Sequence, residues 1–106
     1  ALHSGEGRIK NYLLEVRLNE QEAPLVIELD RSISRYNLHY IATYTLRHKA
    51  DGRVLLNETT RLAGSYDALE SDFATYTARE KTRQLVMKEL ARKIALKLAT
   101  TLKNNS

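Results

Sequence analysis

The chain has 106 residues, of which 42% are hydrophobic and 28% charged, with a formal net charge of +4 and no cysteine. These values favour neither disorder nor a membrane protein, and no apolar run approaches the roughly 18 residues that a membrane-spanning helix needs. The absence of cysteine excludes disulfides, thiolate zinc sites and thiol nucleophiles. We therefore expect a single domain that spans residues 1–106.

The first elements of the chain differ in hydrophobic period. Residues 1–10 contain two glycines and no period, which predicts a loop or a frayed end. From Tyr12 to Leu18, apolar residues at even positions alternate with mostly polar residues, as a half-buried strand requires. The sequence therefore predicts that the regular structure starts near Tyr12.

The strand pattern changes its parity after Leu18. Residues 19–23 interrupt the alternation, and from Leu25 the apolar residues occupy odd positions. Because side chains alternate with a period of two, this change indicates either a hairpin turn or a bulge within one long strand. Pro24 has no amide proton to donate, which favours a sheet edge or a bulge.

Residues 35–48 carry the strongest strand signal. Six successive even positions are apolar or aromatic, namely Tyr36, Leu38, Tyr40, Ala42, Tyr44 and Leu46. The odd positions are polar apart from Ile41. The length and aromatic content predict a central antiparallel strand whose even face meets a helix.

A hairpin and a connection follow this strand. The Asp-Gly pair within residues 49–52 supplies the positive φ that a tight turn needs, so residues 53–63 are expected to return as a strand. Glu58 breaks the apolar parity, which indicates either an edge position or a register shift. Residues 64–76 are predicted to link this strand to a helix. Three of them are expected to pack on the helix end: Tyr66, Leu69 and Phe73.

The last element is a predicted helix over residues 77–103. Thr77 and Glu80 have the spacing of a capping box at its start. An apolar row recurs every four residues at Val86, Leu90, Ile94, Leu98 and Leu102. Leu85 and Leu96 lie beside the row and are expected to widen it. The sequence therefore predicts an α+β fold, in which an antiparallel sheet of three to four strands packs against one long C-terminal helix.

The positive charge is concentrated in this helix. Between Arg79 and Lys103 there are eight basic residues against Glu80 and Glu89. A basic helix beside a nearly neutral body favours an anionic partner, such as nucleic acid, phospholipid or another phosphorylated amphiphile.

No pattern typical of catalysis or metal binding is present. His39 and His48 are nine residues apart on one predicted strand, about 30 Å at the usual rise, and His3 lies in the expected loose end. The serines lack a nucleophile-elbow context, and no glycine-rich phosphate loop precedes a helix. We therefore expect a protein that is not an enzyme and that has no cofactor, no metal and no catalytic residue.

Four segments resemble a known family. They are residues 36–38 (YNL), 59–67 (TTRLAGSYD), 71–74 (SDFA) and 85–91 (LVMKELA). Together they resemble the LPS-assembly lipoprotein family (LptE), in particular its alphaproteobacterial members, over about residues 12–103. The resemblance implies a lipid-anchored protein at the periplasmic face of the outer membrane. It would plug the LptD β-barrel, support the assembly of that barrel and contact lipopolysaccharide. The family's long second strand favours a bulge within residues 19–24.

The resemblance also implies that the N-terminal part of the family is missing. The lipidated cysteine, the first strand and the first helix are not visible, and residues 1–10 look like the tail of that helix and its loop. The sheet edge left open in this way would allow a homodimer. By position, the basic residues that engage lipopolysaccharide fall on Arg79 and Arg31, with Arg35 as a neighbouring candidate. The alternative function is a nucleic-acid-binding or general protein-interaction domain that uses the basic helix face; the family reading implies no nucleic acid.

Overall fold

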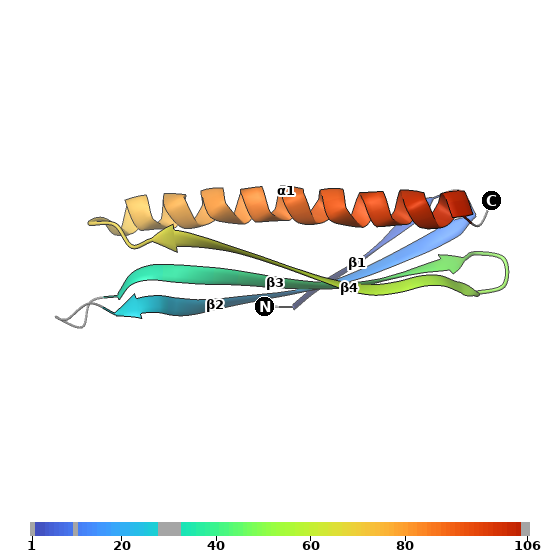
Figure 1. Ribbon diagram of the computed structural model, residues 1–106, viewed down its shortest axis with the longest axis horizontal. Helices are drawn as coiled ribbons and strands as arrows, with labels where there is room; N and C mark the ends of the chain where they lie inside the picture. Colours follow the sequence, from blue (N-terminus) through green and yellow to red (C-terminus); the bar gives the residue numbers. More distant parts are fainter. Residues whose placement is uncertain (1, 10, 28–32, 105–106) are drawn as a thin grey trace.

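The structure, a computed structural model, describes residues 2–9, 11–27 and 33–104. These residues form, in chain order, β1 (Leu2–Ile9), β2 (Tyr12–Ile27), β3 (Ile33–His48), β4 (Val54–Asp67) and α1 (Asp72–Asn104). The strands make one antiparallel sheet in the order β1-β2-β3-β4, and α1 runs along one of its faces (Figure 1). The predicted α+β architecture is confirmed.

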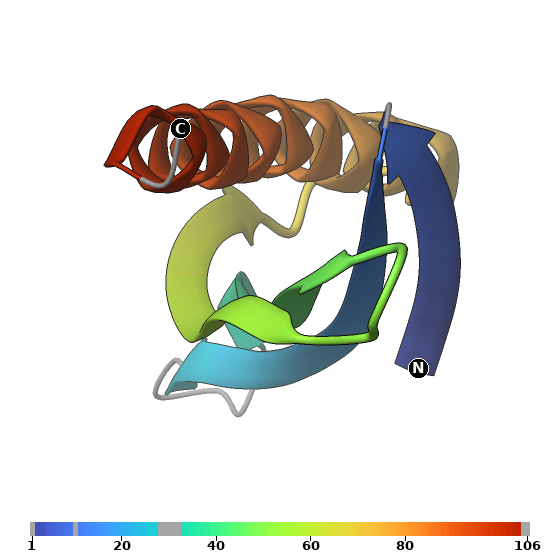
Figure 2. The same ribbon diagram turned by 90° about the vertical axis from the view of Figure 1, so that its right-hand side faces the viewer.

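The molecule is a rod with extents of 59, 21 and 20 Å. Its length comes from the 33 residues of α1, about 50 Å at 1.5 Å per residue, and from three strands of 14 to 16 residues. Viewed along the rod, the sheet curls so that β1 rises beside the helix (Figure 2). The helix therefore covers one face of the sheet and leaves the other face uncovered by any described residue.

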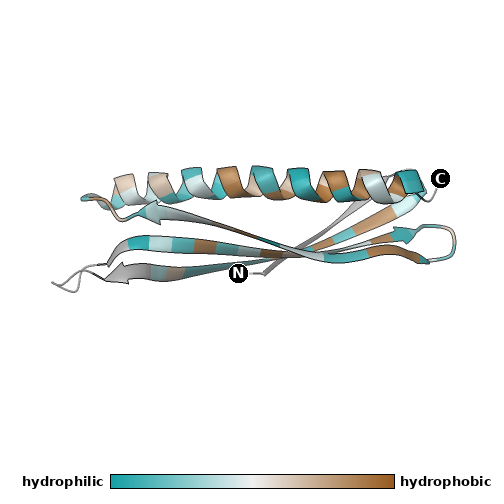
Figure 3. Ribbon diagram, viewed as in Figure 1, coloured by the Kyte–Doolittle hydropathy of each residue, from teal (hydrophilic) through white to brown (hydrophobic). Residues whose placement is uncertain are grey.

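The core forms where the apolar row of α1 meets the even-numbered face of β3. Five even positions of β3 are buried, namely Leu38, Tyr40, Ala42, Tyr44 and Leu46. One hydrophobic cluster joins Val86 and Leu90 of α1 to Leu38, Tyr40 and Ala42. A second cluster joins Leu98 to Tyr44 and Leu46, and Ile94 packs against both clusters. Hydrophobic residues accordingly recur along the whole length of the rod (Figure 3). The predicted contact between the helix row and this strand is confirmed.

Four apolar residues that were expected to pack are instead exposed. Leu69 and Phe73, expected to fold onto the helix end, are 51% and 78% exposed, whereas Tyr66 is buried in β4 and stacks on Tyr36. Leu85 and Leu96 are also mostly in solvent. They lie about three helical turns apart beside the packed row, and Leu85 lines a shallow pocket together with Leu62 of β4. The packed row is therefore narrower than the sequence suggested.

The helix begins before the predicted capping box. Ser71 is the N-cap, since its Oγ accepts a hydrogen bond from the amide of Ala74 at 3.0 Å. Thr77 is already inside the helix, and its hydroxyl donates to the carbonyl of Phe73 at 3.0 Å. The predicted start at Thr77 is therefore wrong, because Ser71, followed by the acidic residue Asp72, caps the helix six residues earlier.

The break in the pattern of β2 is a bulge in one continuous strand. Pairing with β3 is regular from Tyr12 to Pro24, and the register shifts between Pro24 and Ile27. The bulge alternative is therefore right and the hairpin alternative wrong. The shift lies just after residues 19–24. β2 pairs with β1 only as far as Asn19, which is opposite Leu2, so the shifted part of β2 lies beyond this pairing. Pro24 thus occupies an edge position, as its missing amide proton requires.

The prediction of a loop over residues 1–10 is wrong. Residues 2–9 form β1, whose pairing with β2 runs from Leu2↔Asn19 to Ile9↔Tyr12. The strand also excludes the helix tail that the family resemblance implied at these positions. The turn into β2 contains Asn11, which has a φ of 71°. Asparagine tolerates this left-handed conformation, so a tight turn at Asn11 leads into β2 where a loose end was expected.

The β3–β4 hairpin has the predicted turn and a longer second strand. Gly52 has a φ of 73°, as the Asp-Gly pair predicted. β4 continues to Asp67 instead of ending at residue 63, because β3 offers it pairing partners as far as Arg35. Glu58 stays in register opposite Tyr44, and β4 is an edge strand of the described sheet. The edge alternative for this residue is therefore right.

We predict that Leu90→Ala destabilises the fold far more than Leu96→Ala. Leu90 is 4% exposed within the core, so its truncation should cost about 2–5 kcal/mol, whereas Leu96 is 55% exposed and should cost less than about 0.5 kcal/mol. Urea unfolding followed by circular dichroism measures both values. Equal losses would contradict the packing of the apolar row.

We further predict that Gly64→Ala destabilises the fold by about 1–3 kcal/mol. A Cβ at Gly64 would lie 2.7 Å from Cγ2 of Val86 and 2.8 Å from Cγ2 of Thr82, both on stiff β-branched side chains. The same unfolding measurement applied to Gly64→Ala in a Val86→Ala background supplies the control. In that background, the methyl group added at Gly64 should lower the free energy of unfolding by less. An equal loss in both backgrounds would exclude the contact with Val86 as the cause.

Candidate functional site

Five charged residues form an ionic cluster between β2 and the first half of α1. We call Glu20, Glu22, Arg79, Glu80 and Arg83 the β2–α1 cluster. Nε of Arg79 lies 2.7 Å from Oε2 of Glu22, and its Nη1 and Nη2 lie 3.2 Å from Glu80 and 3.4 Å from Glu20. Nη2 of Arg83 lies 2.7 Å from Oε2 of Glu20. With three carboxylates and two guanidinium groups, the cluster carries a formal charge of −1.

The parity of β2 explains why this cluster forms. Glu20 and Glu22 occupy even positions, on the face that Leu14 and Val16 use to pack against the core. The Glu20 side chain is therefore only 8% exposed. Arg79 and Arg83 are one helical turn apart, so both side chains reach the same strip of β2. What looked like an interruption of the strand is thus a pair of inward-facing carboxylates that meet cations from the helix.

Two tyrosines join the cluster from the sheet. The hydroxyl of Tyr66 donates a hydrogen bond to Oε1 of Glu22 at 2.7 Å. Burial, followed by the neighbouring carboxylate, raises the pKa of Tyr66, and the same causes raise the pKa of Tyr40 beside Glu20. Burial alone would raise the pKa of Glu22, but the hydrogen bonds from Tyr66 and Arg79 outweigh it and lower this pKa below its ordinary value.

The three predicted lipopolysaccharide-binding residues have different surroundings. All three guanidinium nitrogens of Arg79 contact carboxylates. The hydrogen bond to Glu22 is the main cause that raises the pKa of Arg79. Arg35 lies on the uncovered face of the sheet, where its Nε contacts Oδ1 of Asp67 at 2.8 Å. Arg31 lies outside the described residues. Arg35 and Arg79 therefore share one end of the rod but lie on opposite sides of the sheet.

The basic face of α1 is less free than its sequence suggested. Arg79 and Arg83 point toward β2, and Nζ of Lys97 lies 3.5 Å from Oε1 of Glu58. Lys81 and Lys88 are exposed and form no ion pair within the described part of the chain.

No helix in the described ranges combines the length and the hydrophobicity that crossing a membrane requires.

The histidines have separate environments in the structure. The ring of His48 meets that of Tyr12 edge-on at 5.6 Å, and its Nδ1 lies 3.7 Å from Asp51. His39 is exposed on the uncovered face of the sheet. Within residues whose side chains are described, no three histidine, aspartate or glutamate side chains gather in a way that could hold a metal ion.

A solved structure of similar fold adds a relationship to these observations. No family model and no curated protein matches the chain. The crystal structure of a candidate lipoprotein from Caulobacter crescentus matches it with a TM-score of 0.72 and 27% sequence identity. The match covers 91% of this chain and 70% of that protein. The chain is similar to a candidate lipoprotein in both fold and sequence.

We predict that Glu22→Gln lowers the free energy of unfolding by about 1 kcal/mol at pH 7. The pKa of Glu22 is lowered in the folded state, so its contribution is present above its ordinary pKa of 4.5 and is lost as the pH falls through the folded value. The difference between wild type and variant should therefore shrink between pH 5 and about pH 3.

Urea unfolding at several pH values measures this difference. Glu89→Gln is the matched control, because Glu89 pairs with Arg92 on the exposed side of α1, and it should give a smaller loss at pH 7. If the difference in free energy of unfolding between wild type and Glu22→Gln stays constant with pH, the ionic role of the Glu22 carboxylate is contradicted.

Proposed function

We propose that this chain is a non-enzymatic module of lipopolysaccharide assembly of the LptE type, which plugs an LptD-type outer-membrane β-barrel and contacts lipopolysaccharide. In the full-length protein it would be lipid-anchored at the periplasmic face of the outer membrane. The similarity to a candidate lipoprotein over 91% of the chain is the observation that carries this proposal. The sequence resemblance to the LptE family supports the more specific assignment.

The shape and polarity of the rod fit the role of a plug. Its cross-section is 21 by 20 Å over a length of 59 Å. The lumen of a large outer-membrane barrel is polar, and such barrels hold plugs of protein. The uncovered face of the sheet suits a polar lumen, since it carries a hydrogen-bonded pair of threonines, Thr43 and Thr59, between ion pairs such as Arg47–Glu15. No catalytic group is needed for this role.

The contact with lipopolysaccharide would use cations at the end of the rod where α1 begins. Arg35 is the more accessible of the two described candidates, with 47% of its side chain exposed against 28% for Arg79. A guanidinium group suits the phosphates of lipid A because it can donate two parallel hydrogen bonds. For Arg79 to do so, it would have to leave the carboxylates of the β2–α1 cluster.

The exposed cations of α1 support the alternative function, a nucleic-acid-binding or protein-interaction domain. Lys81, Lys88, Arg92 and Lys93 are all exposed on the helix. Binding to duplex DNA that weakens steeply with salt, together with no binding to lipopolysaccharide, would favour this alternative.

We predict that the full-length protein fractionates with the outer membrane and co-purifies with a large β-barrel protein. The plug role requires a stable contact with the barrel wall, so the complex should survive mild detergent extraction. Density-gradient fractionation followed by affinity purification and mass spectrometry provides the measurement. Recovery of the protein in the cytoplasmic fraction, without a barrel partner, would overturn the proposed function. The homodimer predicted through an open sheet edge is checked on the same material by light scattering.

A further inference from the structure

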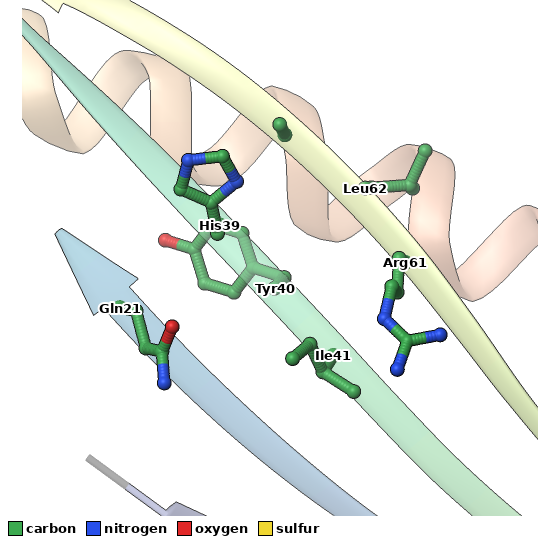
Figure 4. Close-up of a pocket in the computed structure, with 7 residues that line it drawn as sticks. Gln21, His39, Tyr40, Ile41, Arg61 and Leu62 are labelled. Atoms are coloured by element: carbon green, nitrogen blue, oxygen red, sulfur yellow. The ribbon is translucent and has the colours of Figure 1, made fainter. Parts of the chain in front are cut away.

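The uncovered face of the sheet contains a cavity of about 340 Å³ that opens to solvent. It lies where three register positions of the sheet are aligned, with Gln21 of β2, His39 of β3 and Ala63 of β4 across one row. The adjacent row brings Ile41 beside Arg61. Figure 4 shows the side chains of Gln21, His39, Ile41 and Arg61 in front of the sheet, with α1 behind it. The cavity is therefore separate from the β2–α1 cluster, which lies on the opposite side of the sheet.

The lining of this cavity is amphipathic. Ile41 is the one apolar side chain among the outward-facing residues of β3 from Arg35 to Arg47, and it is partly buried. Ala63 extends this apolar surface on β4. Around it stand the guanidinium group of Arg61, the imidazole of His39 and the side-chain amide of Gln21. Such a lining offers hydrogen-bond donors to a polar group and a small apolar surface to the carbon atoms next to it.

The charge distribution on this face selects for an anion. The two arginines toward the ends of β3 are neutralised, since Arg35 pairs with Asp67 at 2.8 Å and Arg47 with Glu15 at 3.4 Å. Arg61 has no ion pair in the described part of the chain. No carboxylate lines the cavity. The middle of the face therefore carries a positive charge that its described neighbours do not compensate, beside two further polar groups.

We propose that this cavity binds the phosphate group of a phosphomonoester amphiphile. Arg61 donates to the phosphate oxygens with the bidentate geometry that guanidinium groups favour, and His39 and Gln21 donate to the remaining oxygens. Ile41 and Ala63 contact the first carbon atoms of the apolar part. The proposal does not rest on the barrel-plugging function, because it concerns the chemistry of this face alone.

A titration of the ¹⁵N-labelled chain with hexyl phosphate tests the proposal. The amides of His39, Ile41 and Arg61 should shift together and saturate. Inorganic phosphate should shift the same amides with an affinity about tenfold lower, because it lacks the carbon atoms that the apolar surface removes from water. Hexanol should cause no saturable shift. Absence of saturable binding by hexyl phosphate would overturn the proposal.

Two variants separate a defined site from a general attraction. Arg61→Gln should weaken hexyl phosphate binding about tenfold, the effect of losing a charged hydrogen-bond donor. Arg17→Gln, also exposed on the uncovered face but outside the cavity lining, should change the affinity less than about twofold. Equal losses for both variants would reduce the binding to diffuse electrostatics and overturn the site. The wild-type chain and Arg61→Gln should have the same urea midpoint, which separates lost binding from lost folding.

A third experiment, the capture of lipopolysaccharide micelles, identifies the natural source of the phosphate. Capture of lipopolysaccharide micelles that weakens with Arg61→Gln supports a lipid headgroup as the ligand. Capture that is insensitive to this substitution, combined with a sensitive hexyl phosphate titration, supports a soluble phosphomonoester. A failure of this site leaves the co-purification with a barrel unaffected, so the two proposals can fail separately.

Discussion

The contact between the apolar row of α1 and the even face of β3 is the interaction on which the rest of the structure depends. Within the described residues the rod is two layers thick, and both hydrophobic clusters lie between these layers. Since strand side chains alternate, covering the even positions of β3 assigns a face to every paired residue of β2 and β4. One contact thus decides which side chains are buried and which are left on the uncovered face.

Carboxylates on the covered face give this contact a register. Glu20 and Glu22 meet Arg79 and Arg83 near one end of the helix, and Glu58 meets Lys97 toward the other end. An apolar row with a spacing of four residues could pack almost equally well after a slide of one turn, about 5.4 Å. Such a slide would separate these ion pairs and leave inward-facing carboxylates without partners, which is costly. The charged contacts therefore add positional information that the apolar row lacks.

The regular parts of the fold could be predicted because their side chains carry a period. The alternation in β3 and the four-residue row of α1 reflect burial on one face, and the Asp-Gly turn reflects the need for a positive φ. β1 could not be found in this way, because its sequence has no alternation and it forms by backbone pairing with β2. The helix start was misplaced because Thr77 and Glu80 match a capping box, whereas the local geometry uses Ser71.

The candidate site shows a stricter limit of sequence reasoning. A basic residue is easily assigned to an anionic ligand from its position in a helix, but its availability depends on carboxylates that are distant in the chain. Arg79 is 57 residues from Glu22 and 2.7 Å from it in space. The even positions of Glu20 and Glu22 indicate that both side chains face inward. This signal was missed because charged residues within a strand pattern are interpreted as an interruption of the strand.

Arg61 and Arg79 differ in their surroundings, although both carry guanidinium groups on a basic protein. Parity places Arg79 opposite buried carboxylates and Arg61 on the uncovered face, next to Ile41, the one apolar residue among the outward-facing positions of β3 from Arg35 to Arg47. A guanidinium group binds a new anion with a net gain only when it does not first have to give up an equivalent one, because the abandoned carboxylate would remain poorly solvated. The partner already in place, more than the residue type, therefore decides which arginine of this fold is available to a phosphate.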